Sequence, residues 1–415
     1  MVVPLQKPGI INDNTHAVVL RQLGLGADTR KDRQDEMTVP IDISVLPAPA
    51  KRLLSEGAPK PPRMMAARGI MPGLKPADIV TVVAALTENE DAEVAAVAQA
   101  TFGQLPPPML NGALATDLDP GVADRLARAY IAHHDVMARV LQLPRLGDDT
   151  LVHCAEHANE KIGELIATNE QRMLACPQVI EKLYMNKKVR MSTSDRLIDL
   201  AVRNGVTLGI PAFKEAAEAI KNELIVQATE EPTYDDVLFQ EVEQLANEVE
   251  TKVGTDDLFV AGEDHNVAPQ EVVVEDARPL YARINDMTVT EKIRAAMLGN
   301  SACRLLLVRD RNRLVAEAAA KSPMLTENDA ARITASRVVG DEVLRIIATN
   351  RELVRNYQVK LNLVQNPRTP FTFAIRLIPQ LRDNDVRLIA RSKNVPSQVC
   401  TAAKRQLLRK AEGKR

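Results

Sequence analysis

Apolar residues along much of the chain recur at the spacing of a helix that buries one face. The first such stretch follows Lys75, and its apolar residues occupy positions i, i+3, i+4 and i+7, namely Ile79, Val82, Val83 and Leu86. Three further stretches begin at Asp91, Asp119 and Asp148, which are 28 and 29 residues apart. A leading Asp accepts the free N–H groups of a first helical turn. The interval leaves room for two short helices, so the pattern predicts an N-terminal helical-repeat domain over residues 75–228.

The same pattern returns in the last third of the chain, where Thr288 or Thr290 could cap a first helix. Three apolar stripes follow one another near the end: Phe373, Leu377, Ile378 and Leu381; Val386, Ile389 and Ala390; and Val399, Ala402 and Leu407. Pro370 fits the first position of a helix, Thr369 could cap that helix, and Pro396 opens the last one. We therefore expect a C-terminal repeat domain over residues 288–415 with a basic terminal helix.

Part of the first pattern repeats in the second. The tetrapeptide Ile166–Asn169 recurs as Ile347–Asn350, 181 residues later, and another Asn follows each copy, at Asn186 and Asn366. Short helices that repeat in this way are typical of stacked helical repeats, in which each unit buries its apolar face against its neighbours. The sequence thus predicts an all-α chain of two repeat blocks without a sheet.

Charge is distributed very unevenly along the chain. Residues 229–277 contain 15 acidic residues and one basic residue, whereas residues 341–415 contain 16 Lys or Arg and 6 Asp or Glu. The carboxylates of this segment repel one another, and the segment offers little apolar surface that folding could bury. We therefore expect residues 229–287 to form an acidic linker between the two blocks. Acidic pairs such as Asp235 and Asp236 are then expected to lie in solvent.

The N-terminal part lacks a clear periodic pattern. Residues 1–38 are polar and irregular, so we expect a disordered leader, and Met37 is an alternative start. Eight prolines between Pro40 and Pro76 favour a Pro-rich extended entry segment over residues 39–74, with one short helix near Ala50.

Composition narrows the classes of fold and function. The 415 residues are 45% hydrophobic and 26% charged, with a net charge of −2, and they include 6 Phe, 5 Tyr and no Trp. Small aliphatic side chains must fill the core, which suits closely stacked helices, and few rings are left for carbohydrate binding or base stacking. No apolar run approaches the roughly 18 residues of a membrane span, and no signal pattern is visible. We expect a cytoplasmic protein without membrane contact.

The C-terminal residues carry a family resemblance. Residues Leu363–Pro370, followed by Leu377, Leu381, Asp383, Asp385–Arg387 and Val395–Pro396, resemble the HEAT-like and leucine-rich-repeat-variant solenoids of bacteria. The resemblance covers residues 290–410 and, more loosely, 85–215. It implies a HEAT-like α-solenoid that serves as a binding scaffold, and it implies no activity. Some leucine-rich-repeat-variant proteins carry a cysteine-ligated iron–sulfur cluster, but the four cysteines here are far apart, so no cofactor is implied.

Few residues are candidates for metal binding or catalysis. His153 and His157 would share a helix face, as zinc ligands often do, with His133-His134 upstream. A His-Glu-x-x-His arrangement is missing and Cys154 points away from the pair, so we interpret the histidines as ordinary helix residues. Cys303 lies in an apolar run and is interpreted as a core thiol. The sequence predicts no metal site and no catalytic residue.

The basic C-terminal residues form the one candidate interaction surface: Arg387, Arg391, Lys393, Lys404, Arg405, Arg409 and Lys410. Such cations attract an acidic protein face, with the acidic linker itself as one option, or nucleic acid, and they also suit the end of a terminal repeat as a solubility cap. The sequence predicts a non-enzymatic protein–protein interaction scaffold. An RNA- or ribosome-associated binder is the alternative, and an enzyme with a site not visible in the sequence is a distant third.

Overall fold

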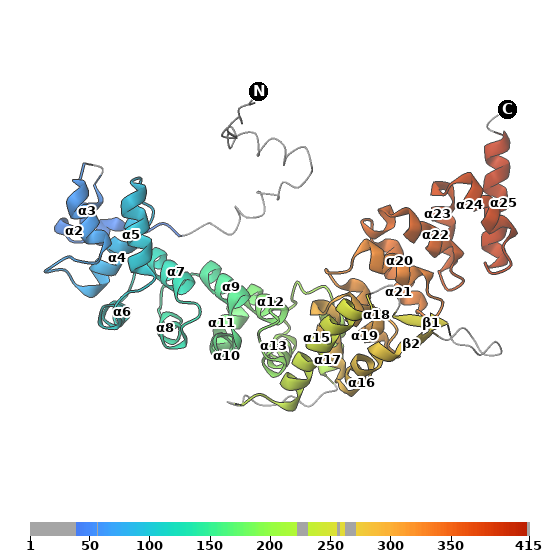
Figure 1. Ribbon diagram of the computed structural model, residues 1–415, viewed down its shortest axis with the longest axis horizontal. Coiled ribbons are helices and arrows are strands. Elements are labelled where there is room, and N and C mark those ends of the chain that lie inside the picture. Colours follow the sequence, from blue (N-terminus) through green and yellow to red (C-terminus); the bar gives the residue numbers. More distant parts are fainter. Residues whose placement is uncertain (1–38, 56, 222–230, 255–257, 262–270, 413–415) are drawn as a thin grey trace, which may run out of the picture. The chain divides into compact units, whose positions relative to one another are not determined.

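The computed structural model of the protein describes residues 39–55, 57–221, 231–254, 258–261 and 271–412 (Figure 1). These residues are mostly helical, as predicted. They divide into two compact units, one of the residues up to Tyr130 with Arg139–Gly147, the other of Ile131–Ala138 with the residues from Asp148 onward. The boundary predicted at residues 229–287 is therefore wrong. The predicted leader and the alternative start at Met37 lie outside the described residues.

The first unit is built from short helices that pack on their neighbours and on the helix two places further along. Helix α4 contacts α5 and α6, and α3 contacts α5. Two of the predicted caps are confirmed, because Asp91 and Asp119 accept the N–H groups of Glu93 and Gly121 at the starts of α5 and α7. The elements are η1 (Ile43–Val45), α2 (Ala48–Leu54), α3 (Lys60–Ala67), α4 (Pro76–Leu86), α5 (Ala92–Phe102), α6 (Pro107–Leu114) and α7 (Pro120–Ala129). The next helix, α8 (His134–Val140), has residues in both units.

The extended entry segment predicted over residues 39–74 is wrong. The short helix expected near Ala50 is present as α2, but a second helix, α3, follows it. Pro61 and Pro62 lie in the first turn of α3, where the N–H groups have no partner inside the helix and proline is tolerated. Ala66 and Ala67 of α3 are fully buried, which makes this segment part of the first core.

The second unit continues the same construction. Helix α17 contacts α19, α19 contacts α21, and α20 contacts α22, so helices two places apart lie against each other. Its elements up to the ribbon are α9 (Asp148–His157), α10 (Glu160–Ala167), α11 (Glu170–Ala175), α12 (Pro177–Met185), α13 (Met191–Arg203), α14 (Phe213–Ile220), α15 (Tyr234–Lys252), β1 (Phe259–Ala261) and β2 (Glu271–Val273). The remaining elements are η2 (Glu275–Ala277), α16 (Arg278–Asp286), α17 (Val289–Leu298), α18 (Ser301–Leu307), α19 (Arg313–Lys321), α20 (Glu327–Ala335), α21 (Asp341–Thr349), η3 (Leu353–Arg355), α22 (Tyr357–Gln365), α23 (Phe371–Leu377), η4 (Ile378–Gln380), α24 (Asp383–Arg391) and α25 (Ser397–Glu412).

Two details of the predicted helices need correction. Asp148 is the first residue of α9 rather than the residue before it. Thr369 does not cap α23, because Pro370 precedes that helix and the buried Thr369 hydroxyl has no bonding partner. By contrast, Thr288 caps α17 as expected, and it forms a reciprocal capping box with Glu291. Leu377 and Leu381 are buried as predicted.

The predicted acidic linker is also wrong, because most of its described residues belong to helices α15 and α16, which pack against other helices. Helix α15 spans 19 residues and contacts α13, α16, α17 and α18. It buries one apolar stripe, made of Leu238, Phe239, Val242, Ala246 and Val249. Strands β1 and β2 form a short antiparallel ribbon, so the prediction that the chain lacks a sheet is wrong at this point. Exposed carboxylates of α15 reach local cations such as Lys187 and Arg283, not the basic C-terminal residues.

Polar contacts between helices recur at similar distances in sequence, 28 to 31 residues. The Tyr130 hydroxyl donates to the Phe102 carbonyl, 28 residues earlier, and the Tyr357 hydroxyl contacts Asp385, 28 residues later. The Asn186 amide donates to the Ala155 carbonyl, 31 residues earlier. The two separations of 28 residues agree with the interval of 28–29 residues between the leading Asp residues of the N-terminal pattern, and the third is two residues longer.

One type of link between helices occurs at five places in the described residues. A polar residue ends a helix, its side-chain oxygen accepts the N–H two residues later at 3.0–3.3 Å, and the next helix begins five residues after it. The residues are Asn186, Ser322, Ser336, Asn366 and Ser392. Asn186 and Asn366 also donate their amide hydrogens to carbonyls at the end of an earlier helix, three for Asn186 and two for Asn366. Free carbonyls at the end of one helix are thereby satisfied by a residue that follows a later helix.

A fully buried cation joins α17 to the end of α12. The Arg294 guanidinium donates to the carbonyls of Tyr184, Asn186 and Val189 at 2.9–3.1 Å. It also lies 5.1 Å from the ring centroid of Phe239 on α15. Carbonyls at a helix C-terminus carry partial negative charge, and an aromatic face attracts cations, so the charge is compensated without a carboxylate within ion-pair distance in the described residues.

We predict that Arg294→Met destabilises the protein by about 3–5 kcal/mol, because it leaves three buried carbonyls without donors. Urea unfolding followed by circular dichroism measures this change. The matched control is Arg283→Met, since Arg283 is half-exposed and its ion pair with Glu241 is on the surface. It should cost less than about 1 kcal/mol. Equal midpoints for the two variants would contradict the role given to Arg294.

Candidate functional site

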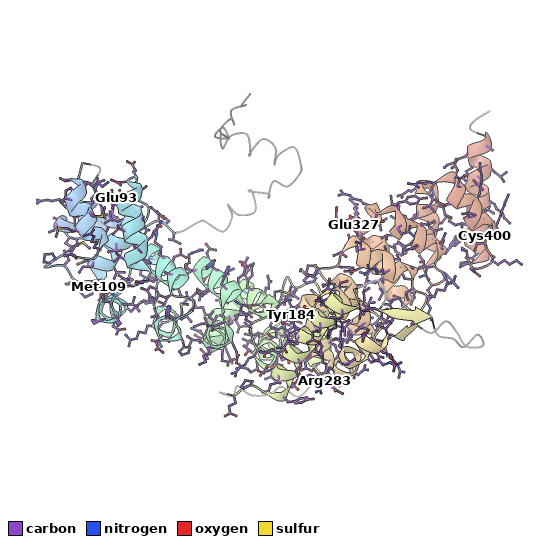
Figure 2. The ribbon with its side chains drawn as sticks, in the orientation of Figure 1. Glu93, Met109, Tyr184, Arg283, Glu327 and Cys400 are labelled. Carbon is purple, nitrogen blue, oxygen red and sulfur yellow. The ribbon has the colours of Figure 1, made fainter. Side chains whose placement is uncertain are left out.

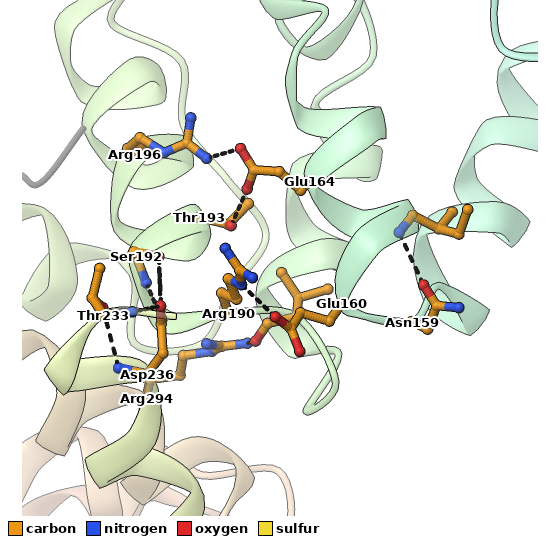
Figure 3. A network of polar contacts seen from close by, with 12 residues as sticks. Asn159, Glu160, Glu164, Arg190, Ser192, Thr193, Arg196, Thr233, Asp236 and Arg294 are labelled. Carbon is orange, nitrogen blue, oxygen red and sulfur yellow. Dashed lines mark hydrogen bonds and ion pairs between the residues drawn. The ribbon is translucent and has the colours of Figure 1, made fainter. Parts of the chain in front are cut away.

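A network of polar contacts links α10, α13 and α15 (Figure 3). Asp236, which is only 4% exposed, is its centre. Its carboxylate accepts the N–H of Thr233 at 2.8 Å and the N–H of Ser192 at 3.0 Å. Burial opposes the charge, yet these bonds hold the pKa of Asp236 below its usual value. The expectation that Asp236 lies in solvent is wrong, because its carboxylate both caps α15 and ties it to α13.

The neighbouring carboxylates of this cluster are matched by donors in the same way. Glu164 accepts from Thr193 and pairs with Arg196, and Glu160 pairs with Arg190 at 2.5 Å (Figure 3). Each pair joins α10 to α13 across 29–32 residues of sequence. The cluster therefore serves to fix neighbouring helices, and it presents no activated nucleophile.

The histidines considered as metal ligands lie on α9, as expected from their spacing. The rings of His153 and His157 stack with centroids 4.3 Å apart, and His157 Nδ1 lies 3.0 Å from the His153 carbonyl oxygen. Cys154 is fully buried. Nowhere in the described part of the chain do three His, Cys, Asp or Glu side chains gather closely enough to hold a metal ion.

Cys303 is a core thiol, as predicted. It is 1% exposed, and burial raises the pKa of its thiol to about 12. It borders a cavity of about 20 Å³ between α15, α17 and α18, which has room for little more than a water molecule. Because the thiolate is the reactive form, Cys303 is unreactive at neutral pH.

The structure places the seven predicted basic residues on the last two helices and the link between them. Arg387 and Arg391 lie on α24, Lys393 lies in the link, and α24 packs directly against α25, which carries the other four: Lys404, Arg405, Arg409 and Lys410. Cys400 marks α25 in Figure 2. Lys410 pairs with Asp383 at 2.6 Å and so fastens the two helices together. In the described part of the chain, Arg391, Lys393, Lys404, Arg405 and Arg409 have no ion-pair partner.

A second basic region was not predicted from the sequence. A groove of about 420 Å³ lies between the end of α21, η3, α22 and α23. Four cations line it: Arg351, Arg355, Lys360 and Arg376. They come from η3, α22, α23 and the turn before η3, spread over 26 residues, and each is unremarkable in sequence. The only available signal was the scarcity of acidic residues between Glu352 and Asp383.

A second groove, whose charged lining residues are mainly acidic, lies between α15 and α16. Its lining includes Glu241, Glu248 and Asp286, with Arg283 as the single cation. Arg283 lies 3.5 Å from Glu241 and 3.7 Å from Asp286, so its charge is shared by two carboxylates. The second unit thus carries both an acidic and a basic groove on different helices.

Comparison of the chain with protein-family models, with curated proteins and with solved structures finds no match. No helix within the described residues is both long and apolar enough to cross a bilayer.

We predict that Asp236→Asn destabilises the protein by about 1–3 kcal/mol at pH 7, because a charged acceptor of several buried bonds is lost. The folded-state pKa of Asp236 is lowered, so its contribution is present above the ordinary Asp pKa of about 3.9 and is lost as the pH falls through the folded-state value. The difference from wild type should therefore shrink as the pH falls below about 4. Denaturant titrations over a pH series measure it.

The adjacent Asp235 provides the control for this experiment. Burial and the neighbouring Asp236 raise the pKa of Asp235, so ionised Asp235 does not stabilise the fold. Asp235→Asn should leave stability at pH 7 unchanged or slightly increased. A loss in Asp235→Asn as large as that in Asp236→Asn would show that position in α15, rather than the Asp236 bonds, determines the effect.

Proposed function

We propose that the chain is a non-enzymatic HEAT-like scaffold that binds a protein partner through its last helices, α23 to α25. The stacking of helices two places apart and the recurrent contacts across about 28 residues support a solenoid of repeats. Proteins of this architecture use the outer surfaces of adjacent repeats as extended binding faces.

Exposed apolar side chains on the last helices are the observation that carries the proposal. Leu388 on α24 is 65% exposed and Leu408 on α25 is 62% exposed. Phe371 and Ile375, four residues apart on α23, are also exposed. A terminal repeat that serves only as a solubility cap presents a polar outer face. Large exposed apolar residues beside cations instead favour a surface that becomes covered by a partner.

The charge of this region indicates which partners it fits. Arg391 lies three residues after Leu388, and Arg409 directly follows Leu408, so each exposed Leu has a cation near it. Such a mixture matches an acidic protein face with apolar residues. RNA is the second candidate because the same cations could contact phosphates, but the exposed aliphatic side chains have no role in phosphate binding.

We predict that Leu388→Ser with Leu408→Ser removes a protein partner captured by the full-length tagged chain, because burial of both side chains contributes to binding. The matched charge variant, Arg387→Gln with Arg391→Gln, should weaken the same capture more strongly at low salt than at about 0.15 M salt. Quantitative mass spectrometry of captured proteins, with and without nuclease, measures both effects.

Two results would count against the proposal. If nuclease treatment abolishes capture, the chain binds nucleic acid, as in the alternative. If both double variants retain the wild-type set of captured proteins, the last helices form a solubility cap. Circular dichroism of each variant checks that these exposed substitutions leave the fold intact.

A further inference from the structure

We propose that the basic groove between α21, η3, α22 and α23 binds an acidic peptide segment that inserts an apolar side chain. This inference rests on the proposed protein-binding function and assigns to it a second, separate contact. It uses residues distinct from the exposed face of α24 and α25.

The groove is strongly positive because its cations are not neutralised. Arg351, Lys360 and Arg376 have no ion-pair partner among the described residues, and no Asp or Glu lines the groove. Only Arg355 is paired, with Glu352 at 2.7 Å, and both side chains of that pair are more than 70% exposed. Exposed pairs of this kind contribute little, so Arg355 remains available to a ligand. Guanidinium groups bind carboxylates through two parallel hydrogen bonds, which favours carboxylates as their ligands.

Part of the lining of the groove is apolar. Val354 from η3 and Phe373 from α23 are half-buried, and Leu377 from α23 is largely buried. Its volume of about 420 Å³ is enough for several side chains. Cations and apolar side chains that line one groove match a peptide in which acidic residues flank an apolar one.

The same features argue against a nucleic acid strand as the occupant. Single-stranded nucleic acid binds through bases stacked on open aromatic faces. Phe373 is the single aromatic residue of the groove, and the Arg376 guanidinium lies 5.9 Å from the centroid of its ring. A half-buried ring accompanied by its own arginine offers little room for a base. An aliphatic side chain fits the remaining apolar surface better.

Fluorescence anisotropy with the full-length chain tests the inference. The probe is a short labelled peptide of glutamates around a central pair of leucines. We expect Arg351→Gln with Arg376→Gln to weaken its binding at least about tenfold, because two charge-assisted contacts are lost. Replacement of both leucines of the peptide by serine should weaken binding by about tenfold as well. Labelled oligouridylate of similar length should bind more weakly than the peptide.

Two further variants make the result specific. Arg351→Lys with Arg376→Lys preserves the charge but not the bidentate geometry, so binding should fall between wild type and the glutamine variant. Arg387→Gln with Arg391→Gln removes the same charge outside the groove and should retain peptide binding within about twofold. Both Arg351 and Arg376 are exposed, and circular dichroism confirms folding.

The outcomes separate this inference from the proposed function. Absence of peptide binding, equal loss in the groove and control variants, or tighter binding of oligouridylate would each overturn the groove assignment. Partner capture that still depends on Leu388 and Leu408 in those cases would leave the proposed function standing. If only the groove variant loses peptide binding, the groove is supported as the peptide site, whatever the capture experiment shows.

Discussion

The arrangement of the second unit depends on a buried positive charge that is compensated by backbone. Arg294 reaches the carbonyl end of α12 from α17 and lies against Phe239 of α15. Burial lowers the pKa of Arg294, but a guanidinium remains charged in proteins, so the three carbonyls must stay in place. A buried charge that lost them would be very costly. Helices α12, α15 and α17 are therefore held to one geometry, although 110 residues separate Arg294 from Tyr184.

The acidic segment takes part in this contact, because Phe239 of α15 lies against Arg294. The total charge of residues 229–277 suggested a linker, but the charges of α15 lie on the faces that its apolar stripe leaves free. Local cations such as Lys187 and Arg283 accompany them. Asp236 then fixes the start of α15 to α13 through backbone donors. A charge count over a long segment hides this pattern, because it averages over the two faces of a helix.

Local features were predicted well from the sequence, and features that depend on distant residues were not. The caps at Asp91, Asp119 and Thr288 and the burial of Leu377 follow from neighbours within one helical turn. The Pro-rich entry was misjudged because proline breaks a helix only beyond its first turn. The basic groove was not predictable, since its cations approach one another only when η3, α22 and α23 are stacked. The amino-acid composition gave no indication that the chain divides into two units near Tyr130.

The link between helices has a consequence for the chemical ageing of the protein. Asparagine slowly loses ammonia when the next backbone nitrogen attacks its side chain, and water then opens the resulting cyclic imide to leave a carboxylate. At Asn186 a carboxylate would direct negative oxygen at the three carbonyls that now accept its amide hydrogens. At Asn366 the next residue is Pro367, whose nitrogen has no hydrogen and cannot complete this reaction. Of the two equivalent links, the one after α22 is thus protected by its own sequence, whereas the one after α12, followed by Lys187, is open to this damage.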